Sequence, residues 1–192
     1  MASLSGLHLR SRLRGRLLRP RLRAIRLLVC DVDGVLTDGG LHYDEEGRVV
    51  KRFDVRDGLA VRMLQRAGIA VALLSGGRSG AIEQRARHLG IEHCRTGVGD
   101  KQAGLAQLHG ELGMAREATA FLGDDLNDLA VRPVTGLLVA PADAARGVRR
   151  QADWVLRQRG GDGALRELGE ALLASRGELA ALQRHGWREG NS

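Results

Sequence analysis

The chain has 192 residues, which is enough for one domain with a substantial core. Its apolar and charged fractions are ordinary for a globular protein, and with only five aromatic side chains a base-stacking nucleic-acid surface is not expected. No apolar run approaches the roughly 20 residues of a membrane span, so stable membrane insertion is not expected either. Cys30 and Cys94 lie far apart without metal-ligand neighbours, which favours two reduced thiols and a cytoplasmic location.

The net charge of +7 is concentrated at the N-terminus. Residues 1–30 contain eight arginines and no acidic residue, and +7 minus 8 leaves −1 for the remainder. We therefore expect residues 1–23 to be a basic, flexible extension of a nearly neutral body. The spacing of Leu and Arg also suits a basic amphipathic helix on a membrane surface, so a membrane- or nucleic-acid-binding arm stays open as an alternative.

From residue 24 onward, apolar runs alternate with helical patterns. Strands are predicted, in chain order, at 24–31, 69–77, 91–97, 118–125, 136–140 and 152–156. Helices are predicted at 56–68, 79–90, 100–113 and 126–134, with one helix or a broken pair at 163–186. Residues 41–55 are predicted to form a β-hairpin with its turn at "DEEG". The order predicts an α/β fold: a Rossmann-like, doubly wound parallel sheet with a β-hairpin insertion.

We expect the domain to span residues 24–175, followed by a C-terminal tail at 176–192. Only 41 residues separate Asp33 from Ser75, and the hairpin and one helix use them, so no separate cap domain is expected. A reactive site on this sheet would be open in a monomer. Our hypothesis is that the 41–55 hairpin or the 157–192 tail of an adjacent subunit closes it.

Polar side chains follow three of the predicted strands: Asp31 and Asp33, Ser75, and Asp124 and Asp125. Ligands of parallel sheets bind beyond the carboxyl ends of the strands, so these side chains are expected to converge. Crowded carboxylates repel one another, and a divalent cation together with a phosphate would offset that repulsion. Mg²⁺, which prefers oxygen ligands, is therefore the predicted cofactor.

Phosphoryl transfer from a monoester gives each of these residues a role. Asp31 is the predicted nucleophile and Asp33 the general acid and base. Ser75 would donate to a phosphate oxygen, and Lys101, at a helix start, would act as a cationic clamp. Asp124 would complete the metal shell, with Asp125 beside it. Asp128 would hold Lys101 or a metal-bound water.

The segments "DVDGVLTDG", "LLSGG" and "GDDLND", together with Lys101, resemble the four motifs of the haloacid dehalogenase superfamily of aspartate-nucleophile phosphatases. "FDVRDG", "IEQRARHLGI" and "GGDGALREL" are further similar to the 3-deoxy-D-manno-octulosonate 8-phosphate phosphatase family. This resemblance covers residues 24–175. It implies Mg²⁺-dependent hydrolysis of a phosphorylated eight-carbon keto-sugar acid through an aspartyl phosphate. It also implies a homotetramer and a product that enters lipopolysaccharide synthesis.

The resemblance also implies a set of site residues. The implied metal ligands are Asp31, Asp124 and the backbone carbonyl of Asp33. The implied substrate contacts are Asp33, Asp54, Val55, Arg56, Asp57, Gly58, Arg62, Arg85 and Lys101. Arginine is a suitable partner for a sugar carboxylate or phosphate because it binds such groups through two hydrogen bonds.

Two positions depart from the family pattern. Gly77 stands where the family usually has an arginine that touches substrate, although Arg78 next to it offers a replacement. Asp162 likewise stands where the family usually has an arginine, in a segment that the resemblance implies approaches a neighbouring active site. These departures keep open a phosphatase for a nine-carbon, sialic-acid-type ulosonate 9-phosphate. A non-catalytic, oligomeric partner domain is a further alternative, although Asp31 and Asp33 are both present.

Overall fold

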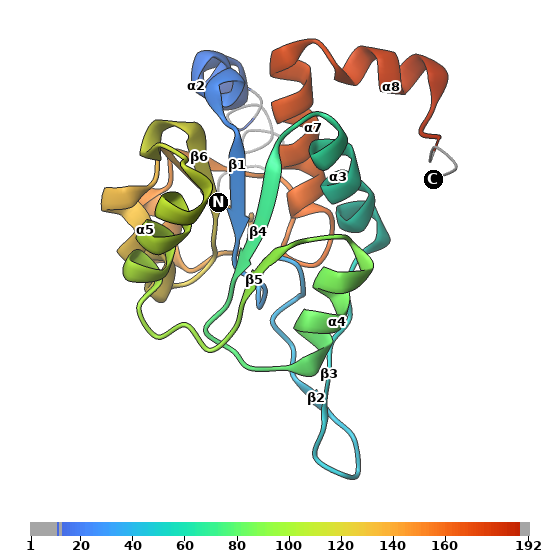
Figure 1. Ribbon diagram of the computed structural model, residues 1–192, viewed down its shortest axis with the longest axis vertical. Helices are drawn as coiled ribbons and strands as arrows, with labels where there is room; N and C mark the ends of the chain where they lie inside the picture. The colour runs from blue at the N-terminus through green and yellow to red at the C-terminus, as the bar shows by residue number, and fades with distance from the viewer. Residues whose placement is uncertain (1–10, 12, 189–192) are drawn as a thin grey trace, which may run out of the picture.

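The computed structural model describes residue 11 and residues 13–188, and its centre is a six-stranded parallel sheet (Figure 1). In spatial order the strands are β5 (His93–Arg95), β4 (Ala70–Leu74), β1 (Leu27–Cys30), β6 (Thr119–Leu122), β7 (Leu137–Ala140) and β8 (Trp154–Val155). β1 is central, with Val29 level with Ala72 on one side and with Phe121 on the other. β1 is fully buried because helices cover both faces of the sheet.

Helices pack on both faces, which confirms the doubly wound α/β fold. They are α2 (Arg19–Ala24), α3 (Val55–Arg66), α4 (Gly80–His88), α5 (Lys101–Leu112), η1 (Arg116–Ala118), η2 (Leu126–Val134), α6 (Arg146–Gln151), α7 (Ala164–Arg176) and α8 (Leu179–His185). Leu28 packs in one core cluster with residues of α3 and α7, whereas Val29 packs with α5 and η2. Alternate residues of a strand point to opposite faces, so β1 belongs to both cores.

The predicted hairpin is formed by β2 (His42–Tyr43) and β3 (Val49–Val50), and it projects from the body (Figure 1). Asp44 fixes its turn, because its Oδ1 accepts from the amides of Glu46 at 3.1 Å and Arg48 at 2.7 Å. Between β1 and β4 the chain forms only this hairpin and α3. The structure therefore has no inserted cap domain there, as predicted.

The N-terminal leader differs from the expected flexible extension, as far as the structure describes it. Leu18 and Leu22 are buried in the main core, and α2 packs against α7. The Ser11 hydroxyl donates to the carbonyl of Val155 at 2.9 Å and accepts from Trp154 Nε1 at 3.0 Å. Leucines spaced by four residues form one helical face, and here that face covers the domain. Residues 1–10 and 12 lie outside the described residues.

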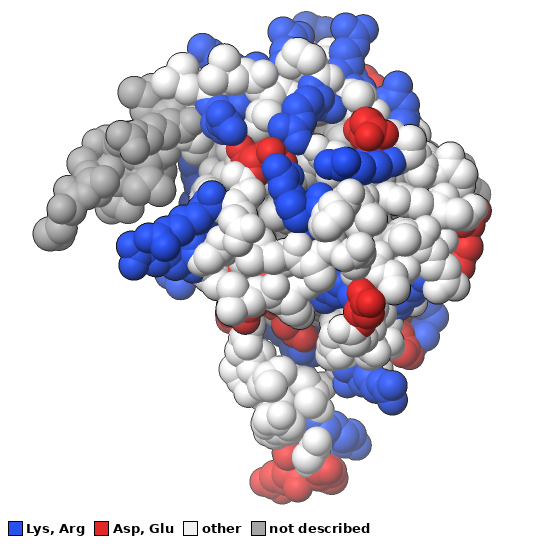
Figure 2. Space-filling view, turned by 90° about the vertical axis from the view of Figure 1, so that its left-hand side faces the viewer, with Lys and Arg blue, Asp and Glu red and all other residues white. Residues whose placement is uncertain are grey.

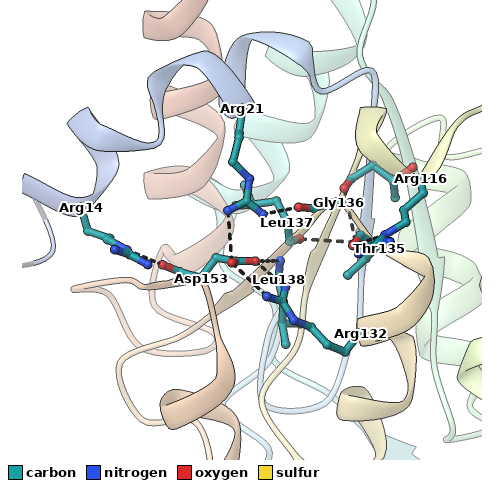
Figure 3. Close-up of polar contacts among 10 residues, drawn as sticks. Arg14, Arg21, Arg116, Arg132, Thr135, Gly136, Leu137, Leu138 and Asp153 are labelled. Carbon is teal, nitrogen blue, oxygen red and sulfur yellow. Dashed lines mark hydrogen bonds and ion pairs between the residues drawn. The ribbon is translucent and has the colours of Figure 1, made fainter.

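Two arginines of the leader, Arg14 and Arg21, contact Asp153, which follows α6 (Figure 3). The backbone carbonyl of Asp153 accepts from Arg14 Nε at 2.8 Å, and its carboxylate pairs with Arg21 at 3.1 Å and Arg132 at 2.6 Å. Burial alone would raise the pKa of Asp153, but the hydrogen bonds from Arg132 and Arg21 outweigh it and lower the pKa to about 2. Part of the basic charge is therefore neutralised within the fold.

The rest of the surface has mixed charge. Figure 2 shows Lys and Arg gathered on the upper part of one face and acidic side chains at the tip of the lower projection, which is the hairpin. Among the described residues, no helix is both long enough and apolar enough to span a membrane. At the other end of the chain, the segment 163–186 is the broken pair of the two predicted alternatives, with Gly177 between α7 and α8.

Candidate active site

A pocket of about 320 Å³ lies where the carboxyl ends of β1, β4 and β6 meet. It is lined by residues from the segments that follow these strands: Asp31, Asp33, Gly34, Gly39, Ser75, Gly76, Gly77, Asp124, Asp125 and Asn127. The structure thus brings together the five polar residues that the strand-end pattern predicts. Three larger pockets, two beside the leader and one beside α8, contain none of them.

Lys101 joins two of the acidic residues through a buried ammonium group. It is the first residue of α5, whose N-cap Asp100 accepts from the amide of Ala103 at 3.0 Å. Lys101 Nζ lies 3.0 Å from Asp31 Oδ1 and 2.6 Å from Asp128 Oδ1, and its side chain is 1% exposed. The cation therefore offsets the charge of two carboxylates that water hardly reaches.

Asp128 is fully engaged by the protein. Its Oδ1 accepts from Lys101, and its Oδ2 accepts from the amides of Asp124 at 2.8 Å and Asp125 at 3.2 Å. Asp31, Asp124 and Asp128 nevertheless lie close enough for one oxygen of each to fall within 4.8 Å of the others. Because the Asp128 oxygens already have donors, Asp31 and Asp124 are the carboxylates available to a metal ion.

The pKa values of these two carboxylates reflect a shortage of positive charge. Burial, followed by the charge of Asp128, raises the pKa of Asp31 to about 6, although Lys101 acts in the opposite direction. Burial, Asp128 and Asp31 raise the pKa of Asp124 to about 7. Asp124 Oδ1 is buried and has no hydrogen-bond partner among the described residues. An orphaned carboxylate oxygen beside a second carboxylate is suited to a divalent cation.

Gly34 makes this arrangement sterically possible. Its φ is +84°, and a Cβ at this position would lie 2.1 Å from Asp124 Oδ2. The chain turns sharply after the Asp31–Asp33 pair while leaving room for the carboxylate from β6.

Asp33 forms an ion pair with Lys51, a residue for which the sequence motifs predict no role in the site. Thr37 Oγ1 lies 3.4 Å from Asp33 Oδ1, and Lys51 Nζ forms an ion pair with the same oxygen. Lys51 belongs to the predicted hairpin, directly after β3. The rarity of lysine could have pointed to Lys51 as a site residue, because Lys51 and Lys101 are the only lysines in an arginine-rich chain.

Ser75 is buried at the end of β4, and its Oγ accepts from the amide of Gly77 at 3.2 Å. Ser75 and Gly77 both line the pocket that also contains Asp124 and Asp125. An anion in the pocket would meet a hydroxyl and a glycine-rich backbone there, which is a suitable environment for phosphate oxygens.

Comparisons with known proteins agree with this arrangement. Residues 91–168 match the model of the haloacid dehalogenase-like hydrolases. The 3-deoxy-D-manno-octulosonate 8-phosphate phosphatase of Haemophilus influenzae is 41% identical over 161 residues, which are 84% of this chain and 89% of the relative. The chain belongs to the 3-deoxy-D-manno-octulosonate 8-phosphate phosphatase family. This confirms the resemblance inferred from the motifs.

Solved structures of the family have the same fold. The Yersinia pestis phosphatase has a TM-score of 0.83 and 40% identity, covering 85% of this chain and 88% of its own. The Moraxella catarrhalis phosphatase, in complex with a magnesium ion, a phosphate ion and a KDO molecule, has a TM-score of 0.85 and 33% identity. The match covers 88% of this chain and 97% of that one. Sheet and connections therefore agree across almost the whole domain.

The residues that match the family's substrate loop lie outside this pocket. Asp54 is the N-cap of α3 and accepts from the amide of Arg56 at 2.7 Å, while Val55 is exposed. Asp57 is buried, and its Oδ1 accepts from the amide of Arg166 at 2.8 Å, in the first turn of α7. Within one chain, Asp54 and Asp57 therefore stabilise helix starts.

The predicted substrate arginines also make contacts within the chain. Arg85 Nη2 donates to the carbonyl of Asp54 at 3.1 Å and lies over the ring of Phe53, in a space that exists because residue 58 is glycine. Arg62 Nη2 lies 3.4 Å from the carbonyl of His88. Neither arginine lines the pocket formed by the described residues.

The two departures from the family pattern have structural counterparts. The Arg78 side chain packs beside Gly97 and does not line the pocket formed by the described residues. Asp162 forms an ion pair with Arg56 of the same chain. Gly161 donates to the carbonyl of Val35 at 2.9 Å, so this glycine-rich segment packs on the loop after β1 of its own subunit.

Proposed function

We propose that the protein is a Mg²⁺-dependent phosphatase that hydrolyses 3-deoxy-D-manno-octulosonate 8-phosphate through an aspartyl phosphate. The observation that carries the proposal is the placement of Asp31 at the pocket, paired with Lys101 and close to the carboxylate of Asp124, whose Oδ1 has no hydrogen-bond partner among the described residues. An attacking carboxylate, a metal position and a buried cation are the three requirements of this chemistry. The curated and solved relatives named above support the substrate.

The roles follow from the positions of the side chains. An oxygen of Asp31 attacks phosphorus, the ester P–O bond breaks, and the leaving alkoxide takes a proton from Asp33. Water then attacks the phosphorus of the aspartyl phosphate and gives a proton to Asp33, which releases phosphate and regenerates Asp31. The Ser75 hydroxyl, whose oxygen accepts from the amide of Gly77, would donate to a phosphate oxygen, and the charge of Lys101 favours the ionised form of Asp31.

Asp31 and Asp124 would hold Mg²⁺, with the carbonyl of Asp33 as a third ligand in line with the family motif. Both raised pKa values and the orphaned Asp124 Oδ1 fit such an ion. When bound, the ion would neutralise the repulsion between the attacking carboxylate and the phosphate.

A nine-carbon ulosonate 9-phosphate is the second candidate substrate, because of Gly77 and Asp162. A Cβ at Gly77 has free space apart from Asp33 Oδ2 at 3.0 Å and Ser75 Oγ at 3.6 Å, so the pocket mouth is wider than with an arginine. Asp162 engages Arg56, which reduces the positive charge offered to a substrate carboxylate. A longer substrate with its carboxylate farther from phosphorus would be less sensitive to both changes.

We also propose that the protein is a homotetramer in which a neighbouring subunit closes the site. The hairpin segment exposes Leu41, Tyr43 and Val50, which are 55%, 64% and 55% exposed. Apolar side chains on a projecting hairpin favour a contact with another subunit. Sedimentation and turnover of Tyr43→Glu at one concentration test this point, because an active monomer would refute it.

The proposed location is the cytoplasm, where the phosphorylated substrate would be made. Cys30 is buried and Cys94 half-buried, and both are free thiols. Free thiols are typical of a reducing compartment.

The test of the function is steady-state hydrolysis of both sugar phosphates with Mg²⁺ by the wild type and by Asp31→Asn. We expect the eight-carbon ester to have the higher kcat/KM, and the variant to lose turnover with both because an amide is not a nucleophile. Turnover by Asp31→Asn would refute the assigned nucleophile. A preference for the nine-carbon ester would select the second candidate.

A further inference from the structure

Lys51 is the second lysine of the chain, and its surroundings set it apart from the other basic residues of the hairpin. Its side chain is 2% exposed although it follows an exposed strand, and its ammonium pairs with Asp33 Oδ1. Arg48, on the same hairpin, has a side chain that is 74% exposed and pairs with Asp44 and Glu46 near the tip. Burying an ammonium group without a counter-charge is costly, so the ion pair with Asp33 stabilises Lys51 in this buried position.

The contact leaves the two oxygens of Asp33 in different environments. Oδ1 receives Lys51 Nζ and lies 3.4 Å from Thr37 Oγ1. Oδ2 faces the opposite way: a Cβ built on Gly77 would lie 3.0 Å from it and 3.6 Å from Ser75 Oγ. Within the described part of the chain, no hydrogen bond to Oδ2 is present. One oxygen is therefore fixed on the hairpin side and the other is open on the pocket side.

We propose that Lys51 is a positioning residue for Asp33: it fixes Oδ1 so that Oδ2 is the oxygen that transfers the proton. The inference rests on the proposed function. In the first step the proton on Oδ2 passes to the ester oxygen as its bond to phosphorus breaks. In the second step Oδ2 takes a proton from the attacking water. Oδ1 keeps its contact with Lys51 throughout.

The length and charge of lysine suit this position. Lys51 reaches from the end of β3 to the loop after β1, so the hairpin is coupled to the acid/base residue of its own subunit. A carboxylate held at one oxygen has less rotational freedom, and proton transfer depends steeply on the position of the donor. Gly77 adds to the effect because it leaves the space beside Oδ2 unfilled.

The test compares two esters with the full-length, Mg²⁺-loaded protein: the sugar-acid phosphate, whose alkoxide needs a proton to leave, and p-nitrophenyl phosphate, whose phenolate leaves unaided. The measured quantity is kcat/KM, since it covers only the steps up to aspartyl-phosphate formation. For Lys51→Met we expect a loss of about 100-fold with the sugar-acid phosphate and less than about 5-fold with the aryl ester. Arg149→Met, which removes an exposed cation on α6 that donates to the carbonyl of Ala142 and does not line the pocket, should retain wild-type values with both.

Equal losses of kcat/KM with the two esters would show a general distortion of the site and overturn the proposal. Wild-type kcat/KM values of Lys51→Met with both esters would also overturn it. Lys51→Gln, which is uncharged and one atom shorter than lysine, replaces it if Lys51→Met does not fold, with the same expected selectivity. A crystal structure of the variant gives a readout independent of activity: Asp33 should leave its present rotamer, and an unmoved Asp33 contradicts the inference. If the wild type itself hydrolyses neither ester, the proposed function fails, which is a distinguishable result.

Discussion

Lys101 and Asp128 form an ion pair with an N–O distance of 2.6 Å, and both side chains are almost completely buried. Asp128 also accepts hydrogen bonds from the backbone amides of Asp124 and Asp125. The pair therefore connects the start of α5 to the loop after β6 and places the cation 3.0 Å from Asp31. A buried pair of this kind is weak evidence for stability by itself, but removing one partner leaves an uncompensated charge.

Lys101→Met should reduce both stability and catalysis. We expect the free energy of unfolding, measured by urea denaturation, to fall by about 3 kcal/mol because Asp128 and Asp31 lose their buried counter-charge. KM should rise and kcat should fall together, since the charge acts before and during phosphoryl transfer. A variant with wild-type kinetics would remove Lys101 from the site. Arg95→Met, which breaks a more exposed pair with Glu111, is the matched control.

Gly34→Ala should weaken Mg²⁺ binding more than it weakens the fold. The new Cβ would lie 2.1 Å from Asp124 Oδ2, so the carboxylate must move away from its position beside Asp31. Gly68→Ala is a close control, because Gly68 also has a positive φ but no atom within 4 Å of the added Cβ. Both variants should lose about 1 kcal/mol of stability through backbone strain. Only Gly34→Ala should need more Mg²⁺ for half-maximal turnover, and equal Mg²⁺ requirements would contradict the geometry.

The stability of the metal-free protein should depend on pH because of Asp31 and Asp124. Their pKa values in the folded protein are about 6 and about 7, above the ordinary value of 3.8. Between these values the folded protein binds more protons than the unfolded chain, so this contribution to stability is lost as the pH rises from about 4 to about 7. Mg²⁺ binds the ionised form, and its stabilising effect should therefore be larger at pH 8 than at pH 5.

Asp124→Asn is the control for this pH dependence. The metal-free variant should show a flatter decline in its unfolding free energy over the same pH range, measured by chemical denaturation at several pH values. An unchanged slope would show that other groups cause the decline.

Leu22→Ala should destabilise the protein without changing catalysis. Leu22 is 2% exposed in the core shared by α2 and α7, so its truncation should cost about 2–5 kcal/mol. Leu17, which is 73% exposed in the same leader, provides the control Leu17→Ala, with a change below about 0.5 kcal/mol. Wild-type stability of Leu22→Ala in thermal melts would favour a leader detached from the domain.

The sheet and the acidic cluster could be predicted from local patterns. Buried runs predict the strands, and a parallel sheet places the residues after β1, β4 and β6 at one edge, so Asp31, Ser75 and Asp124 meet there. The same argument places Lys101 near them only because it begins a helix that follows a strand. These predictions depend on short-range sequence patterns and on one topological rule.

Other features depend on contacts that no local pattern contains. The leader has an amphipathic spacing that suits a membrane surface and a protein surface equally, and only the fold places Leu22 against α7. Lys51 lies in a hairpin, and the alternation of apolar and polar residues that predicts the hairpin does not indicate a contact with Asp33. Asp57 stands in the substrate-loop motif, yet its carboxylate caps α7, which begins more than 100 residues later.

The most direct test of the account is the structure of the protein with Mg²⁺ and beryllium fluoride, which mimics a phosphoryl group on a carboxylate. We expect the fluoride adduct on an oxygen of Asp31, with Mg²⁺ between it and Asp124 and with Ser75 on a fluorine. An adduct on another residue, or a pocket that binds Mg²⁺ without any adduct on Asp31, would contradict the central claim.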